Sequence, residues 1–211
     1  MLSIIQKIDQ IIDERSLLKH PFYEMWSDGK LEFESLAGYS KEYFQLVKQV
    51  PKFMEQLVDS APYEMKPELI FNMNEETDHI ELWRKFASEM HISSEELLNY
   101  QGLKKTNDSV SAISSLMNSL SLGACAMYAF EKEIPMISEI KLQGLKEFYG
   151  LDSKNATEYF EQHMEADIRH TASWRKIIEQ SSENEELMIQ TATKSVSAQN
   201  LLLDSCFEAY C

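Results

Sequence analysis

Apolar residues recur three and four positions apart along most of the chain, which is the period of an amphipathic helix. The first example covers residues 3–18, where Ile4, Ile8 and Ile12 mark one face. His20-Pro21 ends this pattern, because proline disfavours the helical conformation in the residue before it. The same periodicity predicts further helices over residues 31–59, 67–90, 94–100, 110–150, 152 or 153 to 181, and 185–207.

The segments between these patterns contain the turn formers. Residues 21–29 read as a connector that ends at a Gly, and residues 101–109 form the clearest loop in the chain. Pro51 lies inside a predicted helix and is expected to kink it, whereas Pro135 is expected to kink or divide another.

Composition supports a helical fold. Only 6 Gly and 5 Pro occur in 211 residues, which is too few for the many chain reversals of an all-β sandwich or barrel. No repeat, low-complexity tract or linker divides the sequence. We therefore predict one all-α domain over residues 1–211, a single bundle of six to eight helices, with the last few residues disordered.

The charge excludes some partners. With 20 Lys and Arg against 35 Asp and Glu, the formal net charge is −15, which makes nucleic acid and anionic membrane surfaces poor partners. No run of 18 apolar residues and no signal peptide are present, so a cytoplasmic location is expected. Cys125, Cys206 and Cys211 form no C-x-x-C pair, which disfavours a thiolate zinc site. A homodimer or a protein partner stays open.

The strongest chemical feature is the segment from His163 to His170. Steps of four and three place His163, Asp167 and His170 on one helical stripe. Two imidazoles and a carboxylate with open positions are a common way to hold non-haem iron. The alternative is a solvated helix face with two histidines that have ordinary hydrogen-bond partners.

Two other segments add ligands of the same kind. Glu75 and Glu76 lie four and three residues before His79, and Glu-x-x-His is the unit that di-iron bundle proteins project into their cores. Glu131 follows an apolar, small-residue run on the face of Ala124, so we expect it to point inward. A buried carboxylate must be paired, protonated or bound to metal. Together the segments predict two metal ions, with iron favoured and manganese allowed.

Two residues outside the ligand set stand out. Tyr23 follows the His20-Pro21 break, where a helix junction can insert a side chain into one end of a bundle. Lys141 lies ten residues after Glu131, close to the same helical face, although sequence alone leaves it a surface residue because long amines prefer solvent.

The chain resembles the haem-oxygenase-like di-metal oxygenases, which share a fold group with thiaminase II and the pyrroloquinoline-quinone biosynthesis protein C. Within that group it is most similar to the chlamydial para-aminobenzoate synthases of folate supply. The resemblance runs from Ile8 to Phe207 and rests on these segments: His20–Gly29, Val50–Phe53, His79–Trp83, Glu131–Pro135, Gly144–Gly150 and His163–His170.

This resemblance implies a dinuclear centre, dioxygen, a reductant and a set of residue roles. The implied ligands are Glu75 or Glu76, His79, Glu131, His163, Asp167 and His170. It also implies that Tyr23 is consumed as the source of the aromatic ring and that Lys141 donates the amino group. The chain departs from the pattern of these synthases in two ways. The gap between the first glutamate ligand and His79 is shorter, and Phe130 stands where the synthases carry a tyrosine.

Other functions remain open from sequence. The same centre could act on an external small molecule. A metal-free enzyme of the thiaminase II or pyrroloquinoline-quinone biosynthesis protein C type would need a nucleophile such as Cys125, and it would leave the His163–His170 stripe unexplained. A helical interaction protein would fit the acidic surface, but no exposed apolar stripe supports it.

Overall fold

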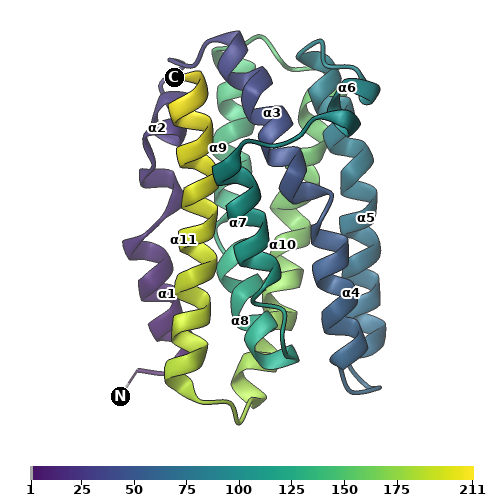
Figure 1. Cartoon of the computed structure of the whole chain (residues 1–211), viewed down its shortest axis with the longest axis vertical. Coiled ribbons are helices and arrows are strands. Elements are labelled where there is room, and N and C mark those ends of the chain that lie inside the picture. The colour runs from purple at the N-terminus through teal and green to yellow at the C-terminus, as the bar shows by residue number, and fades with distance from the viewer. Residues whose placement is uncertain (1) are drawn as a thin grey trace.

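The computed structural model describes residues 2–211, and every regular element within them is a helix (Figure 1). The all-α prediction is confirmed. The elements are α1 (Ile4–Glu14), the 3₁₀ turn η1 (Leu17–Lys19), α2 (Pro21–Ser27), α3 (Phe33–Val47), α4 (Val50–Ser60), α5 (Lys66–Glu89), α6 (Ser94–Asn99), α7 (Lys104–Ser114), α8 (Leu120–Glu131), α9 (Ile134–Glu147), α10 (Lys154–Gln180) and α11 (Glu185–Tyr210).

The longest helices, α10 and α11, run along the long axis of the bundle (Figure 1). Helix α10 packs against α5, α8 and α9, and α11 packs against α8, α7 and α3. One continuous apolar cluster fills the space between them. Side chains that α5, α8 and α10 direct toward one another therefore lie inside the bundle.

Prolines divide helices that the sequence pattern joined. Pro51 was expected to kink a helix over 31–59, but the chain instead ends α3 at Val47 and places Pro51 in the first turn of α4. Pro135 lies in the first turn of α9, after α8 has ended, so it divides the predicted helix, which was one of the two expected outcomes. A proline is tolerated there because the first N–H groups of a helix have no intrahelical partner. This is one reason why the described residues hold more helices than the six to eight predicted.

Two segments expected to be irregular are helical. The predicted connector 21–29 contains α2, whose first turn is capped by the His20 ring nitrogen, which accepts a hydrogen bond from the Phe22 N–H at 3.1 Å. The predicted loop 101–109 is irregular only up to residue 103, because α7 begins at Lys104. Helix α2 matters for function because it buries Tyr23.

The end of the chain is also ordered, in contrast to the expectation. Helix α11 continues to Tyr210, whose carbonyl accepts a hydrogen bond from Ser35 Oγ at 2.6 Å. Its ring lies against Gly38, where any Cβ would overlap the aromatic carbons. None of the helices in residues 2–211 has the length and apolar character needed to cross a bilayer.

Candidate metal centre

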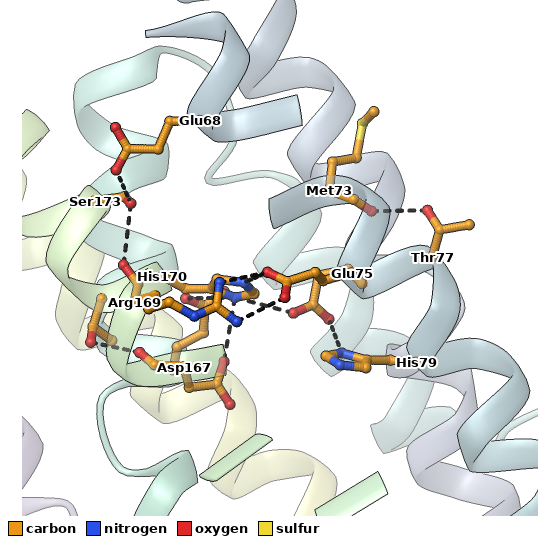
Figure 2. A network of polar contacts seen from close by, with 12 residues as sticks. Glu68, Met73, Glu75, Thr77, His79, Asp167, Arg169, His170 and Ser173 are labelled. Atoms are coloured by element: carbon orange, nitrogen blue, oxygen red, sulfur yellow. Dashed lines mark hydrogen bonds and ion pairs between the residues drawn. The ribbon is translucent and has the colours of Figure 1, made fainter. Parts of the chain in front are cut away.

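Helix α10 presents the predicted stripe to the interior of the bundle. His163, Asp167 and His170 are all buried, with exposed fractions of 5%, 1% and 0%. Figure 2 shows Asp167 and His170 on α10, with the His79 side chain of α5 across from them. Helical periodicity therefore predicted the orientation of this stripe correctly.

Helices α5 and α8 supply the other members of the cluster. Glu76 and His79 of α5 are buried, as is Glu131 at the end of α8. Glu76 Oε2 lies 3.3 Å from His79 Nδ1, and its other oxygen, Oε1, lies 3.3 Å from His170 Nδ1. The Glu76 carboxylate thus lies between a histidine of its own helix and one of α10.

These residues form two groups that share one carboxylate. The first consists of Glu76, His79 and His163, and the second of Glu76, Glu131, Asp167 and His170. Within each group the potential ligand atoms lie within 4.8 Å of one another. Carboxylate oxygen and imidazole nitrogen suit iron and manganese. The arrangement could hold two such ions, with Glu76 between them.

Contacts from outside the cluster orient several ligands. The Nδ1–H of His163 donates to the Tyr159 carbonyl at 2.7 Å, which leaves Nε2 unprotonated. The Trp174 indole donates to Glu131 Oε2 at 2.6 Å, and His170 Nε2–H donates to Glu75 Oε2 at 3.1 Å. Such partners set the tautomer and direction of metal ligands. His163 and His170 each have such a partner.

Three buried atoms of the second group have no hydrogen-bond partner. Glu131 Oε1, Asp167 Oδ2 and His170 Nδ1 are buried without a hydrogen bond. An unpartnered buried polar atom costs free energy, so three of them in one cluster require an explanation. A bound metal ion supplies it, because all three are metal-ligating atoms and belong to one group. The residues present fit the metal centre.

The electrostatics of the cluster favour bound cations. Burial raises the pKa of Glu131 well above its ordinary value, and burial together with the nearby Glu76 raises that of Asp167 to about 6. Burial lowers the pKa of His163 to about 3. For His170 burial acts in the same direction, but contacts with Asp167 and Glu76 outweigh it and raise the pKa to about 11. Without metal, protons must take up part of the negative charge.

Glu75 and Glu76 have different surroundings. Burial acts to raise the pKa of Glu76, but its contacts with His170 and His79 lower it below the ordinary range. Glu75 lies outside both groups and accepts two hydrogen bonds from the Arg169 guanidinium, at 2.9 and 2.7 Å (Figure 2). Glu76 thus belongs to both groups of potential ligands, whereas Glu75 contacts His170 from outside them.

A second buried group lies around Lys141, which the sequence alone left at the surface. Its side chain is 4% exposed, and Nζ donates to the Tyr39 hydroxyl at 2.5 Å. Nζ also lies 4.5 Å from the centre of the Tyr23 ring, within an aromatic cage completed by Trp26, Tyr43 and Phe160. Burial lowers the pKa of Lys141 well below its ordinary value, so the amine is held in surroundings that favour its neutral form.

Small cavities border both groups. One is lined by Glu76, Glu131, His163 and Asp167 together with the apolar side chains of α3 and α4. Another is lined by Tyr23 and residues of α11. Tyr43 and Leu46 line both cavities, so these two side chains separate the metal cluster from Tyr23. Each cavity measures about 10 Å³, which is about the space of one water molecule.

Sequence reasoning missed four residues that support these groups. Tyr159 and Trp174 lie four residues before His163 and four after His170, so the helical stripe itself was a signal for both. Arg169 and the Tyr39 hydroxyl carried no such signal, because their roles depend on contacts between helices. Cys125 is a poor nucleophile, since burial raises the pKa of its thiol to about 12.

Comparison with known proteins identifies a family and relatives of this chain. The family model described as "Iron-containing redox enzyme" matches residues 37–200. A 4-aminobenzoate synthase of Chlamydia pneumoniae is 33% identical to the chain, and the match covers 90% of this chain and 88% of that protein.

Solved structures with this fold include a TenA homologue from Pseudomonas syringae, with a TM-score of 0.85 and 17% identity over 98% of this chain and 93% of that one. A domain from Shewanella denitrificans with a haem-oxygenase-like fold gives a TM-score of 0.80 and 15% identity over 98% and 91% of the two chains. The predicted haem-oxygenase-like fold is thereby confirmed. The chain belongs to the iron-containing redox enzyme family and is a homologue of 4-aminobenzoate synthases.

Proposed function

We propose that this protein is a 4-aminobenzoate (para-aminobenzoate) synthase that uses two metal ions and dioxygen and takes the aromatic ring from its own Tyr23. The proposed ligands are Glu76, His79, Glu131, His163, Asp167 and His170, with iron favoured and manganese allowed. When bound, such ions supply dioxygen activation. Membership of an iron-containing redox family supports this chemistry.

The observation that carries the proposal is the placement of Lys141 against Tyr23. Among the residues that the structure describes, no carboxylate pairs with the buried Lys141 amine, which is unfavourable for folding, so its position needs a functional reason. Its Nζ lies over the Tyr23 ring, and the Tyr23 hydroxyl is 3.3 Å from the Tyr39 hydroxyl that Nζ contacts. The nitrogen is thus near the end of the ring that carries oxygen in tyrosine and nitrogen in 4-aminobenzoate.

The proposed conversion changes a defined set of bonds. The Cα–Cβ bond of Tyr23 breaks, Cα takes up a hydrogen and becomes that of a glycine residue, and Cβ is oxidised to the carboxylate. The ring C–O bond is replaced by a C–N bond and its oxygen leaves as water, while the Nζ–Cε bond of Lys141 breaks and Cε is oxidised to an aldehyde. Two molecules of dioxygen are the oxidant, and an external reductant supplies two electrons, with two protons, so that dioxygen ends in the carboxylate, the aldehyde and water. Because both side chains are used up, each molecule reacts once.

The size of the cavities disfavours an external aromatic substrate. A cavity that holds benzene measures about 150 Å³. The cavities beside the metal cluster and beside Tyr23 each measure about 10 Å³. A free aromatic ring therefore does not fit in either cavity, whereas the Tyr23 ring already lines the second one.

Isotope labelling tests the proposal. The chain is produced with tyrosine labelled with ¹³C throughout the ring, loaded with ferrous iron, and exposed to dioxygen and a reductant. We expect 4-aminobenzoate that carries the label, together with a mass loss in the peptide around Tyr23 and a smaller mass change in the peptide that contains Lys141. Tyr23→Phe should abolish the product at unchanged metal content. Tyr63→Phe is the matched control, because Tyr63 is 84% exposed and remote from both groups.

Two results would contradict this reading. Unlabelled product from labelled protein would show that the ring comes from an external molecule. Undiminished product from the Tyr23→Phe protein would lead to the same conclusion. A parallel experiment with ¹⁵N-lysine tests Lys141 as the nitrogen donor, for which Lys141→Ala should form no product.

A further inference from the structure

We propose that Arg169 is a positioning residue that acts through Glu75 to hold His170 in its ligating orientation. The inference rests on the proposed function, because it takes His170 as a metal ligand. The Arg169 guanidinium makes no hydrogen bond or ion pair with any of the six proposed ligands. It pairs instead with the Glu75 carboxylate, which is not one of them.

The contacts form a continuous chain from the surface to the cluster (Figure 2). Arg169 Nη1 and Nη2 donate to the two oxygens of Glu75 at 2.9 and 2.7 Å, which fixes the carboxylate plane. Glu75 Oε2 then accepts from His170 Nε2–H at 3.1 Å. The other ring nitrogen of His170, Nδ1, faces Glu76, Asp167 and Glu131 and has no hydrogen bond. The Glu75 contact therefore determines which nitrogen the ring offers to a metal.

Helix α5 holds Arg169 from two sides. Phe71 and Glu75 are four residues apart and so share one face of α5. The guanidinium carbon of Arg169 lies 5.6 Å from the centre of the Phe71 ring while its nitrogens bind Glu75. This gives a role to Phe71, which is 56% exposed and has no core function. Stacking and a bidentate pair restrict the Arg169 fork more than either contact alone.

Without Arg169, the hydrogen bond from His170 would be the remaining contact of those described here that holds the Glu75 carboxylate in place. The Glu75 side chain is 25% exposed, and an unpaired carboxylate at that position would turn toward water. The His170 ring would then lose the acceptor for its outer N–H and the restraint on its rotation. The second group of ligands, which contains His170, should be affected more than the first group, which contains His163.

Metal binding tests the inference directly. Metal-free wild type, Arg169→Gln and Glu75→Ala are titrated with ferrous iron under anaerobic conditions against a chelator, and bound metal is measured by elemental analysis. We expect both variants to bind one ion with the affinity of the wild type and the other about 10–100-fold more weakly. Arg175→Gln is the matched control, because Arg175 is on the same helix and pairs with the exposed Glu179.

A double variant separates positioning from other effects. If Arg169 acts through Glu75, then adding Arg169→Gln to Glu75→Ala should not weaken binding further. The melting temperature of the metal-free protein reports any purely structural role of the α5–α10 ion pair. We expect that temperature to change no more in Arg169→Gln than in Arg175→Gln, because exposed ion pairs contribute little to stability.

The outcomes distinguish this inference from the function on which it rests. Two ions bound by wild type and by Arg169→Gln with equal affinity would overturn the inference alone. Additive losses in the double variant would also overturn it. A wild-type chain that binds no iron or manganese would overturn the proposed function, and the inference with it.

Discussion

Asp167→Asn should make the metal-free protein more stable while it weakens metal binding. Asp167 is 1% exposed and lies among Glu76, Glu131 and His170. Burial and the repulsion from Glu76 raise its pKa from 3.8 to about 6, against the opposing effect of His170. An amide has nearly the shape of a protonated carboxyl group, so the variant keeps the packing and removes the charge.

The size of the effect follows from the pKa. A pKa shift of one unit corresponds to about 1.4 kcal/mol. The rise of the Asp167 pKa from 3.8 to about 6 therefore destabilises the folded metal-free chain by about 3 kcal/mol at pH 7. Between pH 3.8 and about 6, the carboxyl group of the folded chain retains a proton that the carboxyl group of the unfolded chain has lost. The Asp167 contribution to the free energy of unfolding therefore falls as the pH rises through this range. The gain from Asp167→Asn should be about 3 kcal/mol at pH 7 and about half of that at pH 5.

Urea denaturation followed by far-ultraviolet circular dichroism measures this gain in protein stripped of metal. Asp78→Asn is the control, because Asp78 is an exposed residue of α5. Chelator titration of the same proteins should show weaker metal binding only for Asp167→Asn. The reasoning is refuted if Asp167→Asn fails to raise the free energy of unfolding, or if the gain is the same at both pH values.

Three further predictions concern metal and Lys141. Chelation should lower the melting temperature, since metal at 100 times its dissociation constant stabilises the native state by about 2.7 kcal/mol; an unchanged transition after confirmed metal loss contradicts a preformed site. His163→Ala should weaken metal binding in elemental analysis without changing the helix content seen by circular dichroism. Lys141→Met should stabilise the metal-free protein near neutral pH. In the wild type, the lowered pKa of Lys141 makes stability rise with pH, by about 1.4 kcal/mol per unit, between the folded value and 10.5. Denaturation at several pH values should show that this slope is lost in the variant.

The sequence alone determined the fold class and the core of the candidate metal centre. Few turn formers and a persistent helical period allowed only a helical bundle. The stripe of His163, Asp167 and His170 could be predicted because helix geometry is local, so spacing along the chain fixes which side chains share a face. Glu131 was predicted for a similar reason, since it continues an apolar run.

The choice between Glu75 and Glu76 required the tertiary structure. Neighbouring residues on a helix point about 100° apart, and both directions are compatible with the pattern around His79. Packing of α5 against α10 turns Glu76 toward His170 Nδ1 and leaves Glu75 between His170 Nε2 and Arg169. Spacing along the chain does not tell which face of α5 contacts α10 at the height of His170.

The burial of Lys141 was decided by the tertiary structure alone. A lysine prefers solvent, so sequence reasoning placed it at the surface. Three contacts reverse that preference: α2 brings the Tyr23 ring over Nζ, α3 supplies the Tyr39 hydroxyl, and α10 supplies Phe160. None of these three helices is α9, which carries Lys141, and they meet it only in the folded bundle. A local preference predicts what one side chain favours, but the contacts between helices decide whether the fold overrides it.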